Sequence, residues 1–245
     1  MLLLTLGKSY AECLSRSCAL FCDPVYYGFG VSQGQGEPVL LIPGFLAGDC
    51  SIAPLGQWLA RIGYRPYLSG IDWNIGCPGR RLEQLKRRVE VIVREKAQPL
   101  VIIGHSLGGL LARSLAARFP AFVSHVVGLG SPVSVERAAL RSEFRFALRA
   151  GAALWDVLTD ASPRCATAEC GCALNSRSRF DAVECDYSAI FSRRDEVVDW
   201  RTCVDPRGDN HEVPGGHCSL IVNAQVYRRL ALILARQRSA SRSPE

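Results

Sequence analysis

A short apolar segment that passes through a glycine-rich turn directly into a helix constrains the fold of this chain most strongly. Residues 99–103 are Pro-Leu-Val-Ile-Ile, and residues 104–109 are Gly-His-Ser-Leu-Gly-Gly. A continuous apolar run of this length is typical of a strand buried on both faces of a parallel sheet. The glycines suit a strained turn in which backbones approach closely. We therefore predict a strand, a sharp turn at Ser106 and a helix over about 110–119.

Apolar strands and helices alternate along most of the chain. Strands are expected at 38–42, 64–69, 125–129, 187–191 and 211–213, and further helices at 51–62, 80–96 and 219–236. Such alternation favours parallel strands with a helix in each crossover. The predicted fold class is α/β, with a mostly parallel central sheet and helices on both faces.

The length of 245 residues fits one α/β domain with additions to it. Residues 37–132 and 186–238 carry the alternation and form the predicted core. Residues 1–36 are expected to pack on this core as an N-terminal extension, and residues 239–245 to form a tail. The strand pattern stops over 133–185, where we predict a small helical, cysteine-rich cap. Because loops at the carboxyl ends of strands carry function, the cap is expected to cover the functional site.

Composition and charge exclude several classes of protein. An apolar share of 48% is too high for a disordered chain, and no apolar run reaches the roughly 18 residues of a membrane span. The net charge of +6 comes partly from arginines spread over helices and tail, without interleaved aromatic residues, so no nucleic-acid partner is expected. The N-terminal Met-Leu-Leu-Leu-Thr-Leu-Gly has no basic residue before its leucines, so a cytoplasmic protein is predicted and secretion stays open as the alternative.

Eleven cysteines leave the redox compartment undecided. Cys165, Cys170 and Cys172, with Cys185 downstream, allow a structural zinc site, disulfides or plain thiols. Their spacing departs from the usual C-x2–4-C pairs of zinc sites, so no metal is predicted and the other two alternatives stay open.

The strand, the Gly-x-Ser-x-Gly turn and the helix resemble those of the α/β-hydrolase superfamily, and Gly-His-Ser-Leu-Gly-Gly resembles the turn of its bacterial lipases and esterases. The resemblance covers roughly residues 38–236. It implies the α/β-hydrolase fold with Ser106 as the nucleophile. It also implies the chain order serine, acid, histidine.

Four histidines are candidates for the general base. Only His211 and His217 follow the region where the resemblance places the acid. His217 lies in a glycine-rich loop between a short strand and the last helix, where the family carries its base, so we predict His217 and keep His211 as the alternative. His105 is expected to pack beneath the turn, and His125 to be a polar residue at a strand entrance.

The acid is expected just past the strand at 187–191. Asp195 occupies this position, and the following Val197-Val198 resembles the family's D-x-x-V pattern. We therefore predict Asp195 as the acid. Asp199 and Glu196 remain alternatives.

Two backbone amides are expected to form an oxyanion hole. By resemblance, one belongs to Phe45, after the glycine of Pro43-Gly44, and the other to Leu107, after the nucleophile. Many relatives carry His-Gly where this chain has Pro43-Gly44. This departure changes the rigidity of the loop but keeps the backbone donor.

These residues together imply a carboxylic ester hydrolase, either a carboxylesterase or a lipase, that works through an acyl-enzyme without a metal or organic cofactor. The expected partner is a small-molecule or lipid acyl ester, and peripheral contact with lipid stays open. The sequence does not indicate an oligomeric state. An acyltransferase or thioesterase with the same triad is one alternative, and a non-catalytic ligand-binding relative is another.

Overall fold

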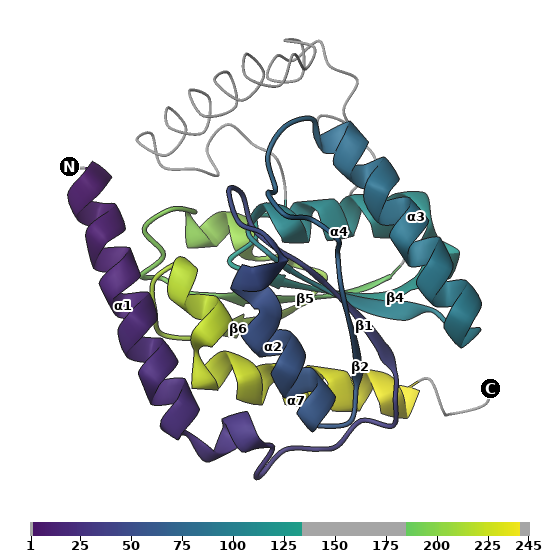
Figure 1. Cartoon of the computed structure of the whole chain (residues 1–245), viewed down its shortest axis with the longest axis horizontal. Helices are drawn as coiled ribbons and strands as arrows, with labels where there is room; N and C mark the ends of the chain where they lie inside the picture. Colours follow the sequence, from purple (N-terminus) through teal and green to yellow (C-terminus); the bar gives the residue numbers. More distant parts are fainter. Residues whose placement is uncertain (1, 134–184, 241–245) are drawn as a thin grey trace.

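A six-stranded sheet forms the centre of the structure, a computed structural model that describes residues 2–133 and 185–240 (Figure 1). Its strand order is β2-β1-β3-β4-β5-β6, and every pairing is parallel. The fold class predicted from the sequence is therefore confirmed. In chain order the strands are β1 (Pro38–Ile42), β2 (Arg65–Leu68), β3 (Leu100–His105), β4 (Val123–Leu129), β5 (Asp186–Phe191) and β6 (Asp209–Glu212).

Helices cover both faces of the sheet because the inner strands are apolar on both sides. Along β1, Val39 and Leu41 join a core with α2 and α7, whereas Leu40 and Ile42 join a second core with α3 and α4. The long helices are α1 (Leu2–Cys22), α2 (Asp49–Arg61), α3 (Pro78–Lys96), α4 (Leu107–Arg118) and α7 (Ala224–Ala240). Short 3-10 helices are η1 (Pro24–Tyr27), η2 (Pro120–Phe122), η5 (Trp200–Cys203) and η6 (Cys218–Val222).

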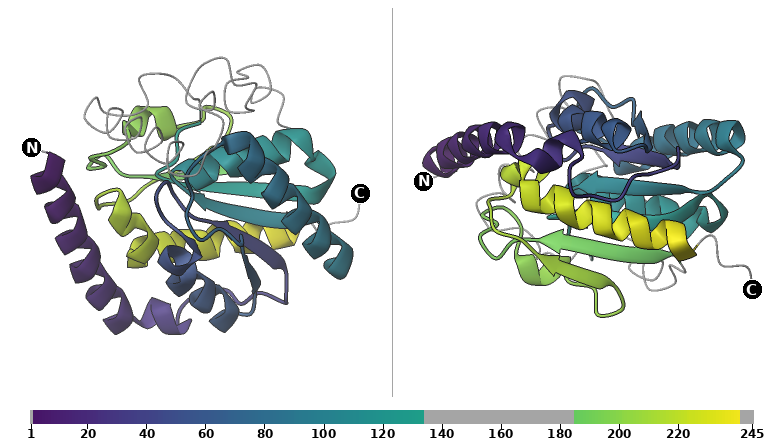
Figure 2. Two further views of the ribbon diagram at one scale, coloured as in Figure 1. Left: turned by 45° about the horizontal axis from the view of Figure 1, so that its top comes forward. Right: turned by 90° about the horizontal axis from the view of Figure 1, so that it is seen from below.

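Two helical segments differ from the sequence-based expectation. The closing helix, expected from residue 219, is divided into η6 and α7. Asn223 lies between them, and its side-chain oxygen accepts a hydrogen bond from the amide of Gln225, which starts a new helix. The N-terminal extension contains α1, for which no helix was expected, and this helix lies along one side of the molecule against η6 (Figure 2).

The predicted limits of the core, cap and tail stay predictions, because almost all of the cap over 133–185 lies outside the described residues. The extension contacts the core through η1 as well as through α1. Trp58 of α2 is fully buried, donates its indole N–H to the carbonyl of Val25 in η1 at 2.8 Å, and lies 4.7 Å from the ring of Tyr227 in α7. One aromatic side chain thus joins η1, α2 and α7.

A buried ion pair ties α4 to the segment before β6. Arg113 Nη1 lies 2.9 Å from Asp205 Oδ2, with both side chains less than a tenth exposed. The Arg113 guanidinium also lies 4.3 Å from the ring centre of Tyr187 in β5. Burial alone would raise the pKa of Asp205, but the amide of Arg207 and the charge of Arg113 hold it below its ordinary value.

Replacing Asp205 with alanine should lower the free energy of unfolding by about 3 kcal/mol, since it leaves the buried charge of Arg113 uncompensated. Because the folded-state pKa of Asp205 is lowered, its contribution is present above the unfolded pKa of about 4 and is lost as pH falls through the folded pKa. Urea unfolding followed by circular dichroism at neutral and acidic pH would measure both effects. Glu212→Ala is the control, because its ion pair with Arg193 is exposed. A variant as stable as this control at neutral pH would contradict the expectation.

Candidate active site

Ser106 lies in the turn between β3 and α4, at the carboxyl end of a central strand. Its φ of 51° and ψ of −119° fall in a region that residues other than glycine rarely adopt. Such a conformation costs on the order of 1–3 kcal/mol and persists only where the surroundings impose it. The Ser106 amide donates to the carbonyl of Leu129 at the end of β4, at 2.9 Å, which fixes the turn against the neighbouring strand.

The glycines around Ser106 are required by close backbone packing, as the sequence suggested. A β-carbon on Gly104 would lie 2.4 Å from the carbonyl carbon and oxygen of Gly108. One on Gly108 would lie 2.2 Å from the carbonyl oxygen of Ile42 in β1. Both contacts are with backbone, which cannot move aside as a flexible side chain can. The start of α4 is therefore pressed against β1 and β3.

His217 and Asp195 form a buried hydrogen-bonded pair. His217 Nδ1 lies 2.7 Å from Asp195 Oδ2, and the two side chains are 6% and 1% exposed. The other carboxylate oxygen, Oδ1, accepts hydrogen bonds from the amides of Val197 and Val198, each at 2.8 Å. These amides explain the position of the acid in the D-x-x-V pattern, because the turn after Asp195 supplies the donors that orient its carboxylate.

This pair sets the protonation of the imidazole. A carboxylate can only accept from Nδ1, so the neutral ring carries its proton on Nδ1 and presents a lone pair at Nε2. Burial by itself lowers the pKa of His217. The charge of Asp195, the hydrogen bond to it and the charge of Glu196 outweigh this effect, and the pKa lies above its ordinary value of 6.5.

His217 and Ser106 are neighbours of the same short stretch at the end of β4. A β-carbon on Gly130, which follows Leu129, would lie 3.2 Å from both His217 Nδ1 and Asp195 Oδ2. His105, beside Ser106, donates from Nε2 to the carbonyl oxygen of His217 at 3.1 Å, and their ring centres are 4.8 Å apart. The structure therefore gathers the predicted serine, histidine and acid around one strand end.

His105 has the packing role expected from the sequence, with one addition. Its side chain is buried, and burial lowers its pKa to about 3, with a smaller effect from the nearby His217. A neutral His105 with its proton on Nε2 can support the His217 carbonyl without placing a second positive charge beside the site.

The alternative base lies elsewhere in the structure. His211 is within β6, with Nε2 2.9 Å from Asp209 Oδ2. His125 is the third residue of β4, where its Nε2 lies 3.0 Å from Ser188 Oγ and burial lowers its pKa to about 4. Neither histidine occupies the loops at the carboxyl ends of the strands.

The two alternative acids contact backbone groups. Glu196 Oε2 accepts a hydrogen bond from the amide of His217 at 3.0 Å. Asp199 caps η5 by accepting from the amide of Arg201 at 3.0 Å. Of the three carboxylates, Asp195 is the one bonded to the ring of His217.

The loop after β1 brings Phe45 next to the turn. A β-carbon on Gly44 would lie 2.8 Å from His105 Nδ1 and 3.3 Å from Ser106 Cβ, so this loop lies directly against Ser106. Within residues 2–133 and 185–240, the backbone N–H groups of Phe45 and Leu107 donate to no protein acceptor. Leu107 is also the first residue of α4, where the helix dipole favours negative charge.

Asn74 supports this loop and was not singled out from the sequence. Its side chain is buried, and its amide donates to the Pro43 carbonyl at 2.7 Å. The backbone carbonyl of Asn74 accepts a hydrogen bond from the amide of Leu46 at 3.1 Å. Leu46 has a φ of 57°, so Asn74 holds a strained loop at both ends. An asparagine in an irregular segment carries no sequence signal of such contacts.

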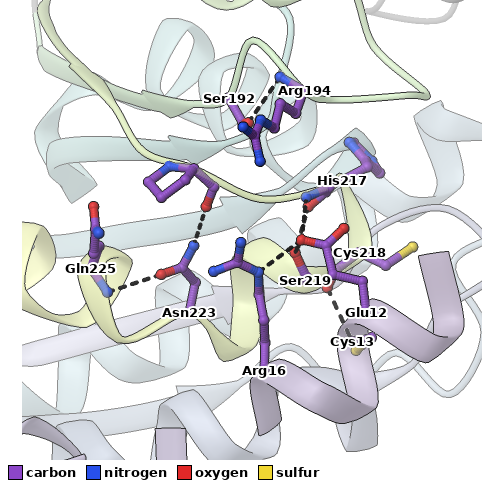
Figure 3. A network of polar contacts seen from close by, with 12 residues as sticks. Glu12, Cys13, Arg16, Ser192, Arg194, His217, Cys218, Ser219, Asn223 and Gln225 are labelled. Atoms are coloured by element: carbon purple, nitrogen blue, oxygen red, sulfur yellow. Dashed lines mark hydrogen bonds and ion pairs between the residues drawn. The ribbon is translucent and has the colours of Figure 1, made fainter. Parts of the chain in front are cut away.

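Side chains from α1 reach the loop that carries His217, as Figure 3 shows. Glu12 Oε1 lies 3.2 Å from the amide nitrogen of Gly216 and 2.8 Å from Arg16 Nε. The sequence offered no functional account of the N-terminal extension. These contacts join it to the candidate site.

The cysteine-rich part of the predicted cap lies outside the described residues, including Cys165, Cys170 and Cys172, and the alternatives for it stay open. No disulfide links cysteines within the described ranges. The same residues hold no group of three or more histidine, cysteine or carboxylate side chains placed for a metal ion. None of the helices described is both long and apolar enough to cross a membrane.

The Asp195→Asn variant should lower the pKa of His217, because the charge of Asp195 and the hydrogen bond to it are what raise this pKa above its ordinary value. Ring nitrogen chemical shifts followed by NMR against pH would measure the change. His105 is an internal control, since it should remain neutral through the neutral pH range in both proteins. An unchanged titration of His217 would show that the 2.7 Å bond does not govern its protonation.

Comparisons with known proteins agree with this architecture. Residues 37–155 match the family model described as alpha/beta hydrolase fold. No curated protein matches the sequence significantly.

Solved structures share the fold at low identity. A carboxylesterase of the ammonia-oxidizing thaumarchaeon Nitrososphaera gargenis is 16% identical with a TM-score of 0.61, over 85% of this chain and 93% of that one. A lipase-esterase related protein from Clostridium acetobutylicum is 13% identical with a TM-score of 0.58, over 84% and 97%. A monoacylglycerol lipase of Paleococcus ferrophilus is 14% identical with a TM-score of 0.55, also over 84% and 97%. The family match over residues 37–155 and the shared architecture show that this chain has the α/β-hydrolase fold.

Proposed function

We propose that this protein is a serine hydrolase that cleaves carboxylic esters through Ser106, His217 and Asp195. The observation that carries the proposal is the buried 2.7 Å bond between His217 and Asp195, next to a serine held at a φ of 51°. A histidine fixed by a carboxylate beside a serine in a strained turn matches the geometry that activates a hydroxyl nucleophile. The similarity in fold to carboxylesterases and lipases supports an ester substrate.

In the first step, Ser106 Oγ attacks the carbonyl carbon of the ester and its proton passes to His217 Nε2. Asp195 accepts from Nδ1 throughout and stabilises the imidazolium that forms. Negative charge moves to the carbonyl oxygen, where the amides of Phe45 and Leu107 are available as donors. Their hydrogen bonds, and the amino end of α4, stabilise this oxyanion.

Collapse of the tetrahedral intermediate breaks the bond to the alcohol oxygen, and His217 returns its proton to the departing alcohol. The acyl group is then held on Ser106 Oγ. Water attacks this acyl-enzyme while His217 Nε2 takes one of its protons. When the second intermediate collapses, the proton returns to Ser106 and the carboxylic acid leaves. Apart from the ester and water, every group in this proposed cycle belongs to the chain, so the proposed reaction needs no metal or organic cofactor.

Replacing Ser106 with alanine should abolish labelling by a fluorophosphonate probe and lower kcat for p-nitrophenyl acetate by at least about 10³-fold, since the nucleophile is lost. Ser114→Ala is the matched control, because Ser114 lies on the same helix α4 and is buried. Gel fluorescence and absorbance assays measure the two effects. Folded wild-type protein that neither binds the probe nor releases p-nitrophenol would instead support a non-catalytic ligand-binding member of the fold.

The length of the acyl group is tested with p-nitrophenyl esters from acetyl to palmitoyl. A carboxylesterase should lose kcat/KM as the chain lengthens, whereas a lipase should gain it. If the acyl-enzyme forms but is released faster by an alcohol or thiol than by water, the protein is an acyltransferase, and faster turnover of a thioester would indicate a thioesterase.

The activity should fall as pH decreases through the pKa of His217, because the protonated imidazole cannot accept the serine proton. Since this pKa is raised, the acidic limb of kcat/KM should lie above pH 6.5, the ordinary value for histidine. Initial rates between about pH 5 and 9 at subsaturating ester would show it. A limb well below pH 6.5 would contradict the role given to the bond with Asp195.

A further inference from the structure

We infer that Glu12 of the N-terminal helix α1 is a positioning residue for the proposed base His217. The inference rests on the proposed function and extends it to a helix that lies outside the family match, which begins at residue 37. It assigns to the N-terminal extension a part in catalysis.

The loop that carries His217 is short and has flexible residues immediately before the histidine. Gly215 has a φ of 135°, and Gly216 has no side chain to limit its motion. The position of the imidazole therefore depends on contacts made by the loop backbone. In the described structure these contacts come from Glu12 in α1, from Glu196 in the loop of the acid and from His105 beside Ser106.

Two consecutive amides of this loop donate to carboxylates from two different segments of the chain. The Gly216 amide donates to Glu12 Oε1 at 3.2 Å, and the His217 amide donates to Glu196 Oε2 at 3.0 Å. A β-carbon on Gly216 would lie 2.9 Å from Glu12 Oε2 and 2.8 Å from Glu196 Oε2, so the two carboxylates flank this residue closely. The backbone is thus held from α1 and from the loop of the acid.

Glu12 is itself fixed and kept ionised. Arg16, one helical turn along α1, donates from Nε to Glu12 Oε1 at 2.8 Å, and Ser219 Oγ lies 3.4 Å from the same oxygen (Figure 3). Although burial raises the pKa of Glu12, the hydrogen bonds from Arg16 and Gly216 lower it below its ordinary value. A charged acceptor makes a stronger bond to an amide than a neutral one.

Cys13, the next residue of α1, also contacts the loop that carries His217. Cys13 Sγ lies 3.9 Å from the carbonyl oxygen of Cys218, directly after His217. Ser219 Oγ, besides its contact with Glu12, lies 2.9 Å from the carbonyl oxygen of Gly216. Helix α1 thus contacts the loop on both sides of the histidine, as Figure 3 shows.

A pair of substitutions separates the hydrogen bond from the packing of the helix. Glu12→Gln keeps an acceptor oxygen and Glu12→Met does not, and both residues are similar in length and good helix formers. Ser15→Ala, at an exposed position of the same helix, is the control. Circular dichroism melting establishes that each full-length variant is folded.

Glu12→Met should lower kcat for p-nitrophenyl acetate by about tenfold with KM changed less than about twofold, because misplacing a catalytic group by ~1 Å costs on the order of 10²-fold. Its acidic limb of kcat/KM should move to lower pH, since a loosened bond to Asp195 raises the pKa of His217 less. Glu12→Gln should stay within about threefold of wild type. Ser15→Ala should equal wild type.

Two results would overturn the inference. One is a Glu12→Met variant with the kcat and acidic limb of Ser15→Ala, and the other is equal loss in the Gln and Met variants, which would assign the effect to charge. Hydrogen exchange of the Gly216 amide in wild-type protein tests the contact without any variant: protection is expected, and free exchange would overturn it. Fluorophosphonate labelling of wild type keeps this test apart from the proposed function, because that proposal fails only if Ser106 is not labelled.

Discussion

The close packing of backbone between β1, β3 and the start of α4 is the constraint on which the candidate site depends. Gly104, Gly108 and the carbonyl of Ile42 approach so closely that no β-carbon fits between them. This packing leaves the chain no room for a gentler turn, and the strain falls on Ser106. A cost of about 1–3 kcal/mol is sustained because two apolar cores bury the elements on either side. The position of the Ser106 hydroxyl is therefore a consequence of how the sheet and helix pack.

The histidine loop is held by a different kind of interaction, a set of hydrogen bonds to its backbone. The carbonyl of His217 accepts from neutral His105, and its amide donates to Glu196. The ring itself is bonded only through Nδ1 to Asp195 among these partners. Fixing the backbone from two sides and the ring from one leaves Nε2 as the nitrogen that can exchange a proton. In the proposed reaction, a base held in this way needs little reorganisation when a serine proton moves to it.

The sequence predicted the parts of the structure that depend on local pattern. Apolar runs located the four inner strands β1, β3, β4 and β5, and the glycine spacing located the turn at Ser106. Chain order left His211 and His217 as candidates, and the glycine-rich loop after a short strand favoured His217, because parallel strands bring their following loops to one edge. Helix ends were less accurate: α4 begins at Leu107, directly after the turn, and Asn223 divides the closing helix.

Contacts between distant segments could not be predicted in the same way. Asn74 supports the Pro43 carbonyl from 31 residues away, and Glu12 accepts from Gly216 across 204 residues. An amide or carboxylate that bonds to a backbone group has no partner side chain to reveal it, so neither residue type nor spacing indicates the contact. Helix α1 was not expected from the sequence, and its residue Glu12 accepts a hydrogen bond from the backbone amide of Gly216.

Glu12 and Glu196, which accept from the amides of Gly216 and His217, also bring two negative charges close to this loop. Two carboxylates beside one loop repel each other, and Glu196 also favours the protonated imidazole of His217. Arg16 offsets the charge of Glu12, and of these two carboxylates it is Glu196 that raises the pKa of His217. The backbone is thus supported by two acceptors while one of them acts on the protonation of the base. Glu196 thus combines a contact to the backbone with an effect on the pKa of His217, whereas the role inferred for Glu12 is positioning alone.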